Sequence, residues 1–216
     1  FEKLLEVVQR VDVRTKVAVI RHEADVSEWH SSRITKVFVD NCHKADIEVY
    51  LPVVGSSAED FDTERHMQAS VRKIMQQCDE LGVDGVDLQY KGFGAEMREQ
   101  YMSYVVALST DLHRTGRKLS ICVNPPMRSD TGEGERYDPE VLGEVCDQVR
   151  VMCYDDAGAS AGVREAMQGW MKFVPRAKLV MGLPAESSDF DLATVDELDI
   201  PAISFWTADR VTPEMW

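Results

Sequence analysis

The chain has 216 residues, 44% hydrophobic and 29% charged, which is typical of a folded globular protein of one domain. Its formal net charge of −14 at pH 7 argues against nucleic-acid binding and against docking on anionic membranes, and it suits a neutral or cationic ligand. No apolar run approaches the roughly 18 residues that a membrane-spanning helix requires, and no signal peptide is evident.

Short runs of β-branched and aromatic residues alternate with longer amphipathic segments. The runs predict strands at 16–20, 47–54, 83–90, 118–124, 148–154, 177–183 and 202–206. The amphipathic segments predict helices at 31–45, 62–82, 98–116, 138–146 and 161–174, and residues 1–11 also look helical. Such alternation predicts a parallel sheet with right-handed crossovers.

Several helix ends are marked by residue type. Asp62 or Thr63 is suited to cap the start of the 62–82 helix, and Gly82 is suited to end it. Asp138 followed by Pro139 predicts a second capped start, because proline is favoured at the first helical position.

Seven strands with one type of crossover fit an α/β fold of the (β/α)8 TIM-barrel type better than an open sheet with helices on both faces. We expect residues 1–216 to form a single barrel domain that lacks strand 1, with residues 1–11 as the helix that follows that strand. In such barrels the functional residues lie at the carboxyl ends of the strands and in the loops after them.

One strand carries polar side chains at a spacing of two. Asp87, Gln89 and Lys91 fall on one face of the 83–90 strand and its extension, opposite apolar neighbours. A buried charge without a partner costs several kcal/mol, so such a column is rarely accidental. We therefore expect it to line the barrel interior and to rise toward the barrel mouth.

The segment DGVDLQYK, residues 84–91, resembles the strand-4 signature of glycoside hydrolase family 18, the chitinase group. That signature reads Asp-Gly-x-Asp-x-Asp-x-Glu. Asp84, Gly85 and Asp87 match it, whereas Gln89 stands in place of an Asp and Lys91 in place of the catalytic Glu. The resemblance thus implies a catalytic ladder in which the last two positions are degenerate.

Three later segments are also similar to the family: VMCYDDAG to its strand 6, LVMGLP to its strand 7 and ISFWTAD to its strand 8. The resemblance spans residues from about 16 to 210 and is nearest the di-N-acetylchitobiase and spore-cortex-hydrolase-like branch. It implies that the substrate-binding residues are Met152, Tyr154, Asp155 and Trp206, with Trp206 as the floor of a sugar subsite.

The family hydrolyses glycosides with help from the substrate itself. A Glu protonates the leaving oxygen, the acetamido group of the sugar attacks, and an Asp two residues earlier stabilises the positive oxazolinium. Gln89 offers no charge to that cation, and Lys91 adds a positive charge beside it. Loss of a general acid alone typically costs about 10²- to 10⁴-fold in rate. We therefore expect an inactive chitinase-like protein that binds N-acetylglucosamine-containing carbohydrate.

Alternatives stand beside these assignments. Lys91 pairs with Asp87 or Asp155 in our preferred interpretation, and in the other it extends into solvent. Tyr154 and Trp206 are also explained as core aromatics, and Asp155 as a turn former. Asn124 is either a loop anchor or a donor into the pocket.

Two other functions remain open. One is a structural or interaction scaffold that binds a protein partner at the open barrel edge. The other is an active glycosidase with relocated carboxylates from Glu96, Glu99 or Glu186.

Cofactors and metals are not expected. The five cysteines are scattered without a Cys-x-x-Cys pair, which indicates buried free thiols rather than a zinc site. The five histidines are scattered too, and those in predicted helices suit surface positions. The sequence leaves the localisation open, and the resemblance implies a secreted or lumenal protein.

Overall fold

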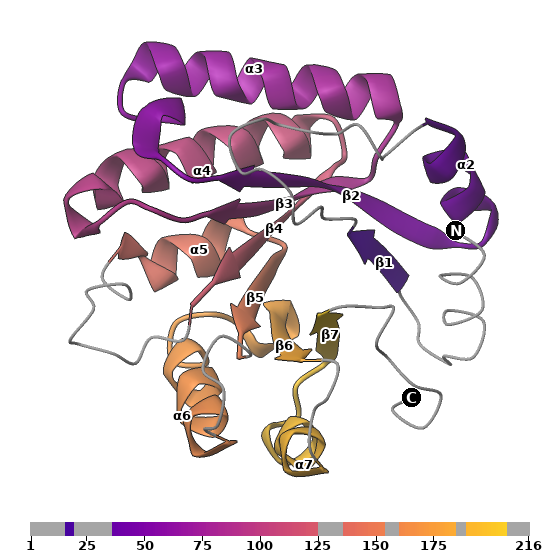
Figure 1. Ribbon diagram of the computed structural model, residues 1–216, viewed down its shortest axis with the longest axis vertical. Helices are drawn as coiled ribbons and strands as arrows, with labels where there is room; N and C mark the ends of the chain where they lie inside the picture. The colour runs from indigo at the N-terminus through magenta and orange to yellow at the C-terminus, as the bar shows by residue number, and fades with distance from the viewer. Residues whose placement is uncertain (1–15, 20–35, 125–135, 154–159, 185–188, 207–216) are drawn as a thin grey trace.

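The computed structural model describes residues 16–19, 36–124, 136–153, 160–184 and 189–206. In this part of the chain a parallel sheet curls into a partial barrel, and helices cover its outer side (Figure 1). The α/β class and the curled parallel sheet are as predicted from the sequence.

The sheet contains seven strands in the order β1 to β7, and every neighbouring pair is parallel. They are β1 (Lys16–Val19), β2 (Ile47–Gly55), β3 (Gly85–Tyr90), β4 (Lys118–Val123), β5 (Gln148–Met152), β6 (Leu179–Pro184) and β7 (Ala202–Trp206). Each one falls on a predicted strand, to within a few residues at the ends. Of the described strands, β1 and β7 form the two edges of the sheet.

Helices connect successive strands. They are α2 (Lys36–Lys44), α3 (Glu64–Leu81), α4 (Arg98–Arg114), α5 (Pro139–Val145), α6 (Ser160–Trp170) and α7 (Asp189–Leu198), with short 3-10 turns η1 (Ala58–Asp60), η2 (Ala95–Met97) and η4 (Arg176–Lys178). The helix α7 was not predicted, because four of its ten residues are acidic and interrupt the apolar pattern. The helix expected at 1–11 lies outside the described residues.

The predicted helix ends are confirmed where the structure describes them. The Thr63 side chain accepts a hydrogen bond from the His66 backbone N–H at 3.2 Å, which caps α3. Gly82 ends the same helix in the left-handed region with φ of 71°. Asp138 caps α5 by accepting from the backbone N–H groups of residues 140 and 141, and Pro139 takes the first helical position.

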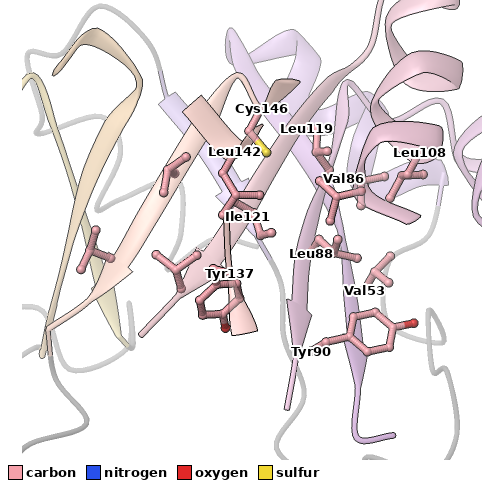
Figure 2. Packing of buried hydrophobic residues seen from close by; sticks show 14 of the residues in the cluster. Val53, Val86, Leu88, Tyr90, Leu108, Leu119, Ile121, Tyr137, Leu142 and Cys146 are labelled. Carbon is pink, nitrogen blue, oxygen red and sulfur yellow. The ribbon is translucent and has the colours of Figure 1, made fainter. Parts of the chain in front are cut away.

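The two faces of the sheet differ in chemistry because strand residues alternate between them. Val86, Leu88 and Tyr90 of β3 point outward into the core that also holds Leu108 of α4 (Figure 2). The strands β2, β4, β5 and β6 likewise send apolar side chains into this layer. The inward face carries the polar residues, so the site must be sought there.

A cluster of aromatic rings anchors the carboxyl end of β3 to the helices. Phe61 lies 5.4 Å from Tyr90 and 5.1 Å from Tyr101 between ring centroids, and Tyr104 stacks on Phe61 at 5.6 Å. The hydroxyl of Tyr90 donates to Asp60 Oδ2 at 2.6 Å. The buried Tyr101 hydroxyl has no hydrogen-bond partner in the described structure.

Two tyrosine-to-phenylalanine variants should therefore act in opposite directions. Tyr101→Phe removes a buried polar group that lacks a partner, so we expect the free energy of unfolding to rise by about 1 kcal/mol. Tyr90→Phe removes a donor to a carboxylate, and we expect a loss of about 2 kcal/mol. Urea denaturation of the two variants measures both changes. An equal loss in both would contradict the hydrogen-bond assignment.

Candidate functional site

The polar column on β3 lies where the sequence placed it. Asp87 is completely buried, Gln89 is 6% exposed, and Lys91, just beyond the end of the strand, is exposed. The backbone N–H of Lys91 donates to the Gly55 carbonyl at 2.8 Å and so continues the pairing of β3 with β2. Exposure therefore increases toward the carboxyl end of the strand, as expected for a column that rises to a barrel mouth.

A glycine turns the chain directly after Lys91. Gly92 has φ of 79°, and a Cβ there would collide with the backbone carbonyl of Ser56. Only glycine takes this conformation and this close approach without strain. The turn leaves Lys91 at the end of the column while the chain continues into η2.

Asp87 is held by side chains of β4, which neighbours β3, and of β5, the next strand in the sheet. Ser120 of β4 donates its hydroxyl to Asp87 Oδ1 at 2.8 Å. Arg150 of β5 places Nη1 at 3.2 Å from Oδ1 and 3.3 Å from Oδ2. The Cys122 thiol lies 3.7 to 3.8 Å from the same carboxylate. The negative charge of Asp87 is thus neutralised inside the sheet by an arginine that is itself 12% exposed.

Gln89 and Met152 meet on the inward side. The Gln89 amide Nε2 donates to Met152 Sδ at 3.0 Å, and Met152 is buried. Met152 was predicted to contact substrate, and the structure places it beside the column. The Met152 thioether and the Gln89 amide are both buried and uncharged.

The expected ion pair between Lys91 and Asp87 is wrong. Arg150 takes the place beside Asp87, and no described carboxylate lies within ion-pair distance of Lys91. The alternative, in which Lys91 extends into solvent, agrees with its exposure. The other expected partner, Asp155, lies outside the described residues, as does Tyr154.

Asp84 lies at the opposite end of β3 from Lys91. Its Oδ2 accepts hydrogen bonds from the Val49 backbone N–H and from His43 Nε2, both at 2.8 Å. Asp84 therefore ties the end of α2 to the start of β2 and β3. The family signature thus begins with a carboxylate that joins elements of the fold, one strand length away from the mouth.

Trp206 is the last residue of β7 and pairs with Pro184 of β6 in the sheet register. It therefore belongs to the same edge of the sheet, the carboxyl edge, as Lys91. Asn124 follows β4 at that edge, and its backbone carbonyl accepts a hydrogen bond from Trp170 Nε1 at 3.3 Å.

Sequence reasoning missed Arg150 and Ser120. A signal was present, since Arg150 stands between two valines in a strand predicted to be buried. Alternation places Arg150 on the same face as Met152, and the register aligns it with Cys122. The buried Arg136, whose guanidinium lies 5.4 Å from the centre of the Phe93 ring, was also missed.

Other candidate groups lie apart from the column. Glu96 and Glu99 are exposed, and in the described structure neither forms a hydrogen bond or ion pair with Asp87, Gln89 or Lys91. Four of the five cysteines are buried free thiols, as predicted, whereas Cys153 is half-buried. Burial raises the pKa of Cys78 and of Cys146 to about 12. The described residues hold no group of three ligands suited to a metal, and none of their helices is long and apolar enough to cross a membrane.

Comparison with known proteins yields a family match over most of the chain. The family model described as glycosyl hydrolases family 18 matches residues 21–213. An uncharacterized glycosylase of Bacillus subtilis (strain 168) is 24% identical over 119 residues, or 50% of this chain. That stretch covers 35% of the relative, so the chain spans about a third of its length.

Solved structures of similar fold include two chitinases and a spore cortex-lytic enzyme. The C-terminal domain of a putative chitinase from Desulfitobacterium hafniense DCB-2 has a TM-score of 0.78 at 13% identity, covering 99% of this chain and 92% of that one. A class V chitinase from Pseudomonas fluorescens Pf-5 has a TM-score of 0.79 at 13% identity, covering 100% of this chain and 93% of that one. The spore cortex-lytic enzyme of Bacillus cereus has a TM-score of 0.73 at 14% identity, covering 100% of this chain and 70% of that one. At these identities the likeness shows the fold alone.

The ion pair between Asp87 and Arg150 can be tested by measuring the stability of variants of the protein. Arg150→Met keeps much of the apolar stem but leaves Asp87 buried without its cation, so we expect the free energy of unfolding to fall by about 3 kcal/mol in urea denaturation. The double variant Asp87→Asn/Arg150→Met should recover most of that loss, because an amide needs no counter-charge. Equal losses in the single and the double variant would contradict the pairing.

Proposed function

The chain belongs to glycosyl hydrolases family 18, and we propose that it is a member that binds carbohydrate without hydrolysing it. The ligand is a glycan that contains N-acetylglucosamine, bound at the carboxyl edge of the sheet. The observation that carries the proposal is the charge pattern of the β3 column. Its only described carboxylate, Asp87, is neutralised by Arg150, and Lys91 stands where the family has its acid.

The proposal includes the architecture around this edge. We take the seven described strands to be part of a (β/α)8 barrel, and residues 1–216 to form one domain of this kind. The curled sheet and the likeness of fold to two solved chitinase structures support this. The candidate sugar contacts are Met152, Tyr154, Asp155 and Trp206, carried over from the family pattern.

The loss of hydrolysis follows from proton and charge chemistry. Glycoside cleavage of this kind needs a group that donates a proton to the leaving oxygen, and an ammonium at Lys91 is a poor donor at neutral pH. Its positive charge also opposes the positive charge that develops on the sugar. Lys91 is exposed, and none of the described carboxylates pairs with it.

The second substitution removes the stabiliser of the intermediate. Gln89 is neutral, and its amide nitrogen already donates to Met152. Asp87 is the nearest carboxylate on the strand, but its charge is balanced by Arg150 and its oxygens accept from Ser120. A preorganised charge accounts for a large share of catalysis in such sites. The column retains no uncompensated negative charge that would stabilise an oxazolinium.

Relocated carboxylates have little support. Glu96 lies on η2 and Glu99 in the first turn of α4, both exposed, and Glu186 lies outside the described residues. A general acid must come within hydrogen-bond reach of the glycosidic oxygen. The described contacts bring neither Glu96 nor Glu99 to the column.

Binding and turnover can be separated in one experiment. N-acetylchitotetraose is titrated into the protein in a calorimeter, and the mixture is then analysed for shorter sugars by mass spectrometry. We expect heat of binding with the sugar intact. Binding with cleavage would overturn the inactive assignment, and absence of heat at millimolar sugar would leave a protein-binding scaffold as the better account.

A restored variant provides the matched control. Gln89→Asp/Lys91→Glu rebuilds the family pattern, and we expect its hydrolysis of a fluorogenic chitobioside to exceed that of the unmodified protein by about 10²-fold or more. Lys91→Gln removes the lysine without supplying an acid and should stay inactive. Equal rates for the unmodified protein and the restored variant would contradict the proposed role of the two substitutions.

A further inference from the structure

Among the residues that the structure describes, the charges on the inward face of the sheet pair with one another, with one exception. Five charged residues of the described chain belong to this face by strand alternation: Glu48, Asp87, Lys91, Lys118 and Arg150. Glu48 Oε1 binds Lys118 Nζ at 2.7 Å near the amino ends of the strands. Asp87 binds Arg150 at mid-height. Lys91 remains, and it lies at the carboxyl end where the glycan is proposed to bind.

Two described carboxylates that follow β2, those of Asp60 and Asp62, are engaged elsewhere. Asp60 accepts the hydroxyl of Tyr90, whose side chain lies on the outer face. Asp62 accepts from His66 at the start of α3. Arg150 cannot substitute for Lys91 as an anion receptor, since its Nη1 is occupied by Asp87 below the mouth. Of the cations that the structure describes on the inward face, Lys91 is therefore the one that remains accessible to a ligand.

We propose that Lys91 makes the carboxyl edge of the sheet select glycans in which N-acetylglucosamine alternates with a sugar acid, in preference to neutral chitin oligosaccharides. The inference rests on the proposed carbohydrate-binding function and names the class of glycan. The chain as a whole carries a net charge of −14, which repels anions, so a preference for an acidic sugar must arise from a local contact. An ammonium at the mouth supplies that contact to a uronate carboxylate.

The size of the preference follows from the exposure of Lys91. A charge pair that is open to water contributes modestly, so we expect about three- to tenfold tighter binding of the acidic glycan at low salt. The preference should vanish at about 1 M salt, where the Debye length is about 3 Å. A neutral oligosaccharide should show little change between the two conditions.

The test compares two tetrasaccharides of equal length by calorimetry: N-acetylchitotetraose and a hyaluronan tetrasaccharide, which alternates N-acetylglucosamine with glucuronate. Lys91→Gln should abolish the preference for the hyaluronan fragment, and Lys91→Arg should retain it. The control is Lys172→Gln, an equal change of charge at an exposed position after α6, which should leave the preference intact. Thermal unfolding of each variant confirms that the fold is unchanged.

The outcomes separate the two proposals. Equal affinity for both sugars, or a preference that survives in Lys91→Gln, overturns the inference about Lys91 and leaves the carbohydrate-binding function standing. Binding of neither sugar overturns both. A preference that disappears with Lys91→Gln and with salt, and that persists in Lys172→Gln, supports the assignment.

Discussion

The ion pair between Asp87 and Arg150 is the constraint on which the interior of this sheet depends. It joins β3 to β5 across β4, which contributes the Ser120 hydroxyl to the same carboxylate. A fully buried carboxylate without a cation would cost several kcal/mol. The curvature of the sheet brings the inward faces of β3 and β5 together, and this lets Arg150 pair with Asp87. Gln89 and Met152 then lie above the pair as an uncharged floor.

The same constraint shapes the chemistry at the carboxyl edge. The carboxylate of Asp87 is neutralised by Arg150 in the sheet interior, and the proposed loss of hydrolysis takes this charge as unavailable to a cationic intermediate. At the amino edge two carboxylates repeat one arrangement. Asp84 and Asp147 each accept a backbone N–H of the preceding strand and a histidine Nε2, all at 2.8 Å. Asp84, the first acid of the family signature, and Asp147 thus join elements of the fold at this edge.

Much of the fold could be predicted from the sequence because apolar strands and capped helices leave local signals. Gly82 and Asp138 mark helix ends through backbone geometry and capping, which depend only on neighbouring residues. The helix α7 was missed because its acidic residues mask the apolar periodicity. Periodicity also assigned Lys91 to the correct face of the sheet. It did not identify the partner of Asp87, because Arg150 lies 63 residues later in the chain and reaches Asp87 only through the length of its side chain.

The central claim is that this column no longer stabilises an oxazolinium-like cation. Its most direct test compares the affinities of di-N-acetylchitobiose and of a cationic oxazoline analogue of the same sugar. Analogues of a transition state bind active enzymes about 10²-fold or more tightly than the substrate does. The account predicts that the two ligands bind this protein within about tenfold of one another, because Gln89 and Lys91 provide no negative charge. An analogue that binds a hundredfold tighter, on the order seen for active enzymes, would contradict it.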